Sequence, residues 1–255
     1  MQTYLSVSPG DAAGFSASGL QCAHAAYRIG PDSTLLRRNL LLDTKGGLLS
    51  VSDRDAPNIC DPKALSNAAL RECNRRNYKG VLLDFELPCR HDLLQFAQHL
   101  ASLLHSSKRL LFTPESYAHQ VPQASPIICT ALSGGDLTER LKQAVSAYPQ
   151  RSLALDVQRL RMDFSLPARS GEGRPLTADE LQQLIRERQP SIFFSPALCT
   201  RYFTYMQNRT PHFVLFDDAE TLCQKVRIGK QLGYSSTFFQ WPEICDIAEQ
   251  IFRHL

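Results

Sequence analysis

A buried strand that ends in two carboxylates is encoded by the stretch Gly80-Val81-Leu82-Leu83-Asp84-Phe85-Glu86. Side chains alternate between the two faces of a strand, so Leu82, Asp84 and Glu86 share one face. The other face carries only apolar side chains, which suits packing against helices. In a parallel barrel the first face lines the interior, and both carboxylates then lie at the carboxyl end of the strand, where barrel enzymes hold their active sites.

A carboxylic acid at that position has a physical reason to stay protonated. Apolar walls and a second carboxylate both raise its pKa, and a protonated acid can serve as a general acid. Asp84 and Glu86 are therefore candidate catalytic residues. A second interpretation fits equally well at this point: two carboxylates at the edge of a loop, each paired with a nearby Arg or Lys. The short D-x-E pattern alone does not choose between them.

Beyond residue 62, short apolar runs alternate with amphipathic helical patterns. Strands are predicted at residues 78–86, 109–113, 126–131, 152–157, 191–194, 212–216 and 237–240. Helices are predicted at residues 64–76, 91–106, 137–148, 178–188, 218–233 and 244–252. This alternation predicts a parallel sheet covered by helices. The number of repeats favours an α/β fold of the (β/α)8 type, a TIM barrel, over the doubly wound sheet that the same pattern permits.

The chain length of 255 residues suits one such barrel. We therefore expect a single domain over residues 1–255. The first third of the barrel is expected to be irregular, because Asp43-Thr44-Lys45-Gly46-Gly47 predicts a turn between two strands where a regular barrel has a helix. A small insertion is expected before the last strand, over approximately residues 165–217.

Composition excludes several classes of partner. The net charge is only +3, with Lys and Arg scattered along the chain, so we expect no nucleic-acid partner. No apolar stretch reaches the roughly 18 residues of a membrane span, and residues 1–7 do not resemble a signal peptide. The eight cysteines form no C-x-x-C pair, which argues against a zinc site and for buried free thiols in the cytoplasm. A disulfide set behind a removed leader is the alternative, and the oligomeric state is not predicted.

Three segments carry a family resemblance. Residues 80–86 are similar to a fourth-strand signature written D-G-x-D-x-D-x-E, whose related form is G-V-N-x-D-F-E. Residues 202–225, from Tyr202-Phe203-Thr204-Tyr205 to Lys225, are similar to the pattern Y-F-x-Y … H-x-V-W-Y-E-D-x-x-S … K. Residues 233–241 resemble a last strand that ends in Trp. These patterns belong to glycoside hydrolase family 18, in its branch acting on bacterial peptidoglycan and spore cortex. The resemblance covers roughly residues 62–250 and implies a TIM barrel.

The resemblance also implies substrate-assisted, retaining hydrolysis of polymers that contain N-acetylglucosamine, such as peptidoglycan, spore cortex or chitin-like glycans. Glu86 would protonate the glycosidic oxygen while the 2-acetamido oxygen of the substrate attacks the anomeric carbon. Asp84 would hold the acetamide N–H and stabilise the oxazolinium ion. No metal or cofactor is required. The candidate substrate-binding residues are Trp241, which would stack on a sugar, Gln158, Tyr202 and Tyr205.

Departures from the family pattern favour a second function. Leu82 replaces a motif carboxylate, and Ala131 stands where the family has a Tyr that donates to the acetyl oxygen. Loss of one such donor costs on the order of 100-fold in rate. The alternative is therefore a catalytically inactive barrel that binds a sugar chain or another protein. Without the resemblance, the position of Trp241 is typical of a core aromatic residue. Tyr202 and Tyr205 could equally pack within a hairpin.

Overall fold

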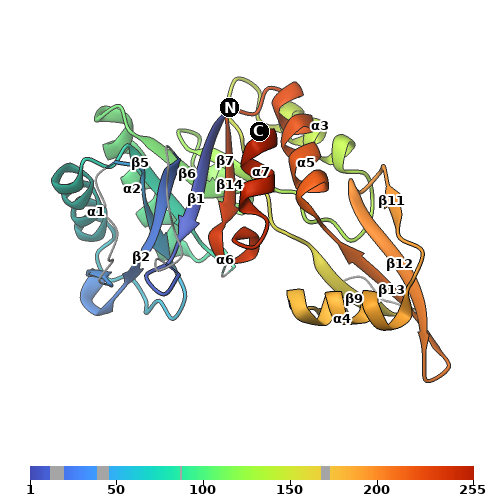
Figure 1. Cartoon of the computed structure of the whole chain (residues 1–255). Coiled ribbons are helices and arrows are strands. Elements are labelled where there is room, and N and C mark those ends of the chain that lie inside the picture. Colours follow the sequence, from blue (N-terminus) through green and yellow to red (C-terminus); the bar gives the residue numbers. More distant parts are fainter. Residues whose placement is uncertain (12–19, 39–45, 87, 168–172) are drawn as a thin grey trace. The chain divides into compact units, whose positions relative to one another are not determined.

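The computed structural model describes residues 1–11, 20–38, 46–86, 88–167 and 173–255. The chain separates into two compact units (Figure 1). The first contains residues 1–128, 150–156 and 234–242, and the second contains residues 129–149, 157–233 and 243–255. In the described parts of the chain, no helix is long and apolar enough to cross a bilayer. The single domain expected over residues 1–255 stays a prediction.

A closed barrel of eight parallel strands, counted over the described residues, forms the first unit (Figure 1). In sequence order these strands are β1 (Gln2–Val7), β2 (Gln21–Ile29), β4 (Leu48–Ser52), β5 (Gly80–Asp84), β6 (Leu110–Pro114), β7 (Ser125–Cys129), β8 (Ala154–Asp156) and β14 (Ser236–Gln240). They are neighbours in that same order, and β1 pairs with β14 to close the ring. The predicted (β/α)8 barrel is confirmed.

The irregular first third is also confirmed. Between β2 and β4 the chain forms a short 3-10 turn (Pro31–Ser33) and an extra strand, β3 (Leu35–Arg37), antiparallel to β2. The predicted turn at residues 43–47 lies partly outside the described residues. Gly46 and Gly47 within it have φ of 81° and 73°, which glycine adopts without steric cost.

One layer of side chains fills the barrel. Each strand contributes one member of this layer, which consists of Tyr4, Ala23, Leu48, Leu82, Phe112, Ile127, Ala154 and Phe238. Tyr4 stacks on Phe238 with ring centroids 5.0 Å apart, and Phe112 meets Phe238 edge-on at the same distance. The interior at this level is thus a packed core, and a ligand can enter only above it, at the ends of the strands.

The outward face of β5 packs against two helices, as the alternation predicts. Val81, Leu83 and Phe85 belong to a core with buried residues of α1 (Pro62–Arg76) and α2 (His91–Ser106). Asp61 starts α1 by accepting a hydrogen bond from the Ala64 N–H, which satisfies one of the free donors of the first turn. This core fixes the register of β5, because a shift by one residue would turn Asp84 into it.

The second unit holds the insertion between β8 and β14. Five antiparallel strands lie in the order β10 (Arg174–Pro175), β9 (Arg161–Ser165), β13 (Thr210–Phe216), β12 (Thr200–Gln207) and β11 (Phe193–Ser195). One face of this sheet packs on α4 (Ala178–Arg188), whose predicted capping box of Thr177 and Glu180 is present. The antiparallel part runs from residue 161 to 216, close to the predicted insertion. The unit also contains α3 (Leu137–Ala147) and α5 (Ala219–Gln231).

The closing helix differs from the prediction. In place of one helix over residues 244–252, the structure has α6 (Trp241–Ile244) and α7 (Ala248–His254). Arg159 explains the break, because its guanidinium donates to the Glu243 carbonyl at 2.9 Å and also binds Asp246 at 2.6 Å. The Ile247 N–H, which would bond Glu243 in a continuous helix, bonds Ile244 at 2.9 Å.

None of the eight cysteines, all of which lie among the described residues, is in a disulfide in the structure, and their reduced state in solution stays a prediction. Their predicted burial is wrong for half of them. Cys73, Cys199 and Cys223 are buried and Cys22 is half-buried, whereas the exposed ones are Cys60, Cys89, Cys129 and Cys245. The exposed thiols lie at the ends of helices and strands or just outside them, where an apolar neighbourhood in sequence does not guarantee cover.

Candidate active site

The carboxylate pair lies at the carboxyl end of β5. Leu82 is buried in the barrel interior with 5% of its surface exposed, Asp84 is half-buried above it, and Glu86 follows two residues later. Phe85, between the carboxylates, is buried and packs against Phe96 and Tyr117, with ring centroids 6.4 and 5.6 Å away. The predicted register is confirmed for Leu82, which lies in the barrel interior, and for Phe85, which lies in the core under the helices. Because β5 ends at Asp84, the direction of the Glu86 side chain stays a prediction.

A third carboxylate, Asp53, was missed from the sequence. It directly follows β4, whose last residue, Ser52, pairs with Asp84. Asp53 is fully buried, and its Oδ1 accepts a hydrogen bond of 2.9 Å from the Glu86 backbone N–H. This bond fixes the direction of the chain as it leaves β5. The signal was available, because Asp53 ends an apolar run beside β5, but the first 60 residues lack the helical periodicity that would have placed them.

The surroundings of Asp84 raise the pKa of its carboxyl group. Burial, followed by the negative charges of Glu86 and Asp53, raises the pKa of Asp84 to about 6, and Arg54 opposes the rise. Glu86 itself is 68% exposed and lies 3.9 Å from the guanidinium of Arg54, a loose pair in solvent that is worth little. The arginine pairing that the second interpretation of the motif expects is therefore present, but it leaves Glu86 accessible.

The raised pKa of Asp84 predicts a dependence of stability on pH. A carboxyl whose pKa is higher in the folded state stabilises the fold below its unfolded pKa of 3.8, and that contribution is lost as pH rises through about 6. Asp84→Asn, which is always neutral, should therefore exceed the wild type in unfolding free energy by up to about 3 kcal/mol at pH 7.5 and match it near pH 4. Urea titrations at both pH values measure this difference.

Asp55→Asn serves as the control for that comparison. Asp55 lies two residues beyond Asp53, and its side chain is 81% exposed. Its replacement should shift stability by less than about 0.5 kcal/mol at either pH. A gain for Asp84→Asn that is the same at pH 4 and pH 7.5 would contradict the electrostatic origin.

The remaining predicted residues follow the ends of other strands or lie in the second unit. Trp241 comes directly after β14, begins α6 and is half-buried. Gln158 is half-buried two residues beyond β8. Ala131 follows β7 by two residues and offers only a methyl group where the family pattern has a hydroxyl.

Tyr202, on β12, is the middle member of a row of three aromatic rings that crosses the sheet. Its ring centroid is 5.5 Å from Phe193 and 5.3 Å from Phe213, on the neighbouring strands of the sheet. Phe193 is 52% exposed, so this face of the sheet is apolar and open over part of its surface. Sugar binding by Tyr202 stays a prediction.

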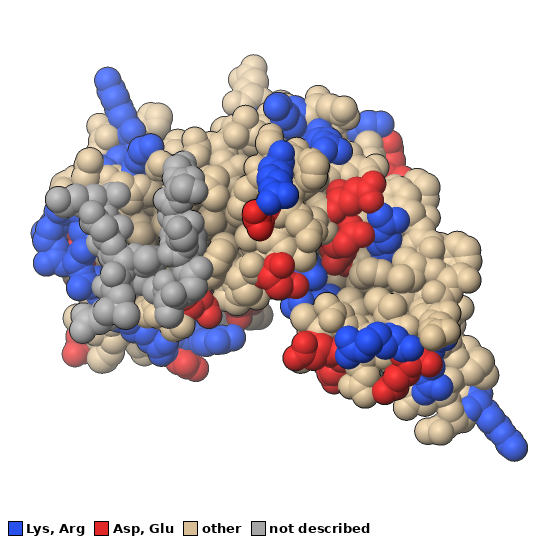
Figure 2. All heavy atoms as spheres, in the orientation of Figure 1, with Lys and Arg blue, Asp and Glu red and all other residues tan. Residues whose placement is uncertain are grey.

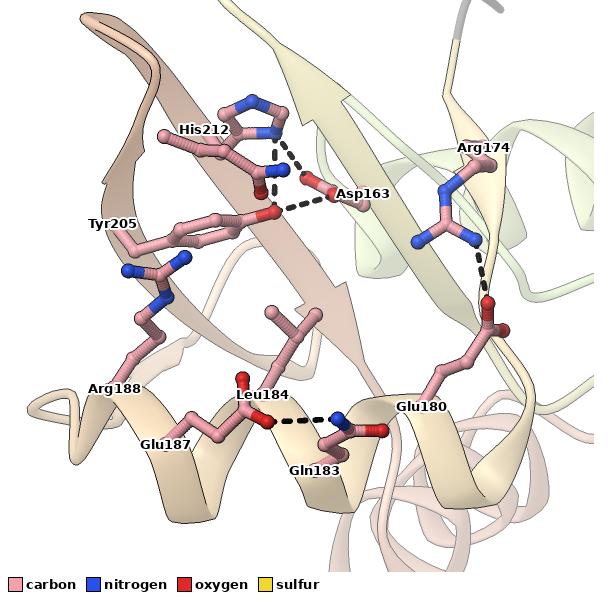
Figure 3. Close-up of a pocket in the computed structure, with 10 residues that line it drawn as sticks. Asp163, Arg174, Glu180, Gln183, Leu184, Glu187, Arg188, Tyr205 and His212 are labelled. Carbon is pink, nitrogen blue, oxygen red and sulfur yellow. Dashed lines mark hydrogen bonds and ion pairs between the residues drawn. The ribbon is translucent and has the colours of Figure 1, made fainter.

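Tyr205 borders a cavity of about 340 Å³ between α4 and the sheet of the second unit (Figure 3). Its hydroxyl donates to Asp163 at 2.7 Å, and burial with this carboxylate raises the pKa of Tyr205 to about 12. His212 stacks on one side of the ring at 4.7 Å and also bonds Asp163, while the Arg188 guanidinium lies 5.6 Å from the ring centroid. These contacts favour the packing interpretation of Tyr205, and its role in glycan binding stays a prediction.

No metal centre is indicated in the described part of the chain, since no three His, Cys, Asp or Glu side chains there are grouped to hold an ion. The site built from Asp84, Glu86 and Asp53 offers acid–base chemistry: one half-buried carboxyl that titrates near pH 6 beside one that solvent reaches.

Comparison with known proteins extends these observations. No family model and no curated protein matches the sequence. Solved structures do match. A plant class V chitinase from Cycas revoluta, solved with (GlcNAc)3, superposes with a TM-score of 0.68 at 13% identity, over 98% of each chain. The spore cortex-lytic enzyme SleL of Bacillus megaterium gives 0.66 at 15% identity, over 93% of this chain and 70% of that one.

The chain has the fold of the family 18 glycoside hydrolases. A chitinase from Chromobacterium violaceum agrees, with a TM-score of 0.63 at 16% identity over 94% of each chain. Counted along the barrel, β5 is the fourth strand, β7 the sixth and β14 the eighth. The strand that ends at Asp84 is thus the fourth of the barrel, as the resemblance of residues 80–86 implies.

Proposed function

We propose that the protein is a glycosidase that cleaves polymers containing N-acetylglucosamine by substrate-assisted, retaining catalysis. The observation that carries the proposal is the pair Asp84 and Glu86 at the mouth of a family 18 barrel, the first half-buried with a raised pKa and the second open to solvent. The similar structures include chitinases and a spore cortex-lytic enzyme, which supports glycans of chitin or peptidoglycan type as substrates.

In the proposed reaction, Glu86 gives its proton to the glycosidic oxygen as the bond breaks. The acetamido oxygen of the substrate attacks the anomeric carbon and forms an oxazolinium ion, which water then opens. Asp84 holds the acetamide N–H, and its carboxylate stabilises the positive charge as it develops. The hydrogen bond from the Glu86 N–H to Asp53 keeps the acid on the mouth side of the strand end. As the water attacks, the Glu86 carboxylate takes up its proton and returns to the acid form, so the cycle needs only the chain, the substrate and one water molecule.

A second function is favoured by two particular residues. Leu82 is an apolar member of the barrel core in place of a carboxylate that could share a proton with Asp84, and Ala131 has no donor for the acetyl oxygen. Both favour a barrel that binds a glycan without cleaving it. Incubation with chito-oligosaccharides and peptidoglycan fragments across about pH 4 to 8 separates the two. Cleavage supports the enzyme, and binding without cleavage supports the binding module. If the glycans are neither cleaved nor bound, both functions are rejected.

Trp241→Ala tests the binding half of either function. Loss of an aromatic platform for a sugar should weaken binding of an N-acetylglucosamine oligomer by about tenfold, because stacking contributes roughly 1–2 kcal/mol. Isothermal calorimetry on a variant that cannot cleave, such as Glu86→Gln, measures the affinity without turnover. Trp241→Phe keeps a ring and should retain most of the binding. If both substitutions leave the affinity unchanged, Trp241 is a packing residue.

A further inference from the structure

A cavity separate from the one beside Tyr205 lies in the first unit, outside the barrel wall. It has a volume of about 340 Å³ and lies where β2, β3 and α1 meet. Its lining residues are Tyr27, Leu35, Arg37, Ala68, Arg71, Glu72 and Arg75. Tyr27 belongs to the core on the outer side of the strands, so the cavity is separate from the barrel interior. Figure 2 shows Lys and Arg side chains gathered at this edge of the unit, where Figure 1 places α1.

Among the described residues that line the cavity, Glu72 is the one carboxylate, and its hydrogen-bonding capacity is already occupied. Its Oε1 accepts from the Tyr27 hydroxyl at 2.8 Å and from Arg76 at 2.6 Å. Its Oε2 accepts from Arg75 at 2.6 Å, and Arg37 lies 3.9 Å from Oε1. The side chain of Glu72 is only 11% exposed. The carboxylate therefore organises the arginines around it and offers nothing further to a ligand.

The cavity consequently carries an excess of positive charge. Arg37, Arg71 and Arg75 line it against the single negative charge of Glu72, an excess of two charges among its lining residues. Arg71 is exposed and takes no part in the contacts of Glu72. Guanidinium groups held near one another repel, and an anion placed among them removes that cost. Their planar fork matches the oxygens of phosphate and carboxylate groups.

We propose that this cavity binds a phosphate monoester, with the phosphate against Arg37, Arg71 and Arg75 and the organic part against Leu35 and Ala68. A phosphate monoester brings close to two negative charges at neutral pH and so neutralises more of the excess than a carboxylate, which brings one. The two apolar side chains give the organic part of the ligand a surface that inorganic phosphate cannot use. This site is independent of the proposed glycosidase activity.

The test uses phenyl phosphate as the probe and the full-length protein. We expect phenyl phosphate to bind by calorimetry more tightly than benzoate, which has the same ring with one charge, and more tightly than inorganic phosphate. Arg71→Gln should weaken phenyl phosphate about tenfold or more, because it removes a charged donor without disturbing Glu72. Added salt should weaken binding as well.

Arg186→Gln is the matched control, because Arg186 is an exposed arginine of α4 in the second unit. It should leave the affinity for phenyl phosphate unchanged, and so should Glu86→Gln at the barrel mouth. The proposal is overturned if phenyl phosphate does not bind at millimolar concentration, if Arg71→Gln binds it as the wild type does, or if benzoate binds as tightly. Circular dichroism of each variant verifies that it is folded.

Discussion

Under the proposed function, we expect Glu86→Gln to lower the turnover of N-acetylglucosamine oligomers by about 100-fold or more and to leave their affinity nearly unchanged. Glutamine keeps the shape of the side chain and its capacity to hydrogen-bond, but it has no acidic proton to give to the leaving oxygen. The side chain of Glu86 is 68% exposed, and the backbone N–H bound by Asp53 survives the substitution. The variant is therefore expected to fold as the wild type does, so the loss of rate reports on chemistry.

The measurement is the release of reducing ends from a soluble oligomer, with kcat and KM determined separately. Glu249→Gln is the control, since Glu249 is an exposed carboxyl on α7 whose partner is Arg253. Its kcat should equal that of the wild type. A Glu86→Gln variant with unchanged kcat would remove the general-acid assignment, and an equal loss in both variants would point to a nonspecific effect of charge.

We expect Asp217→Asn to destabilise the protein by about 3–5 kcal/mol, because it leaves the buried ammonium group of Lys225 without its anion. Lys225 and Asp217 are 1% and 0% exposed and form an ion pair of 2.7 Å inside the second unit. Asp217 also accepts from the Thr221 hydroxyl and the Leu160 N–H, both at 2.9 Å. Asparagine retains the shape but not the charge that Lys225 requires.

Lys225→Met should cost a similar amount, because it leaves the Asp217 carboxylate buried without its cation. The double variant should lose clearly less than the sum of the two single losses, since neither charge is then stranded. Lys230→Met, on the exposed side of the same helix, should change stability by less than about 0.5 kcal/mol. Urea unfolding followed by circular dichroism gives these values. Additive losses in the double variant would show that the two charges do not depend on each other.

The sequence predicted correctly those features that depend on residues close together along the chain. The register of residues 80–86 follows from alternation in a strand with one apolar face, and the start of α4 follows from its capping box. Both depend on neighbours within a few residues. The Asp84–Glu86 pair was found for the same reason, since the two carboxylates are only two residues apart at the end of β5.

Contacts between distant residues were not predictable in that way. Arg159 interrupts the closing helix from 84 positions away along the chain, and no periodicity signals such a contact. Asp53 joins the site only because β4 lies beside β5 in the barrel. The cavity proposed to bind a phosphate monoester is formed by residues of β3 and α1. The sequence gives no sign that Arg37 lies near Glu72, since the two residues are close only in the folded chain.

Because β1 pairs with β14, the barrel cannot close until β14 has been synthesised. Residues 2–6 pair with residues 236–240, so β1 is synthesised long before its partner strand β14. Until then β1 has only β2 beside it, and one of its edges lacks a partner strand. Contacts of such long sequence separation slow folding, and an unpaired strand edge invites association between chains. We therefore expect the barrel to close only after residues 236–240 have been made, and until then chaperones can keep that edge from pairing with other chains.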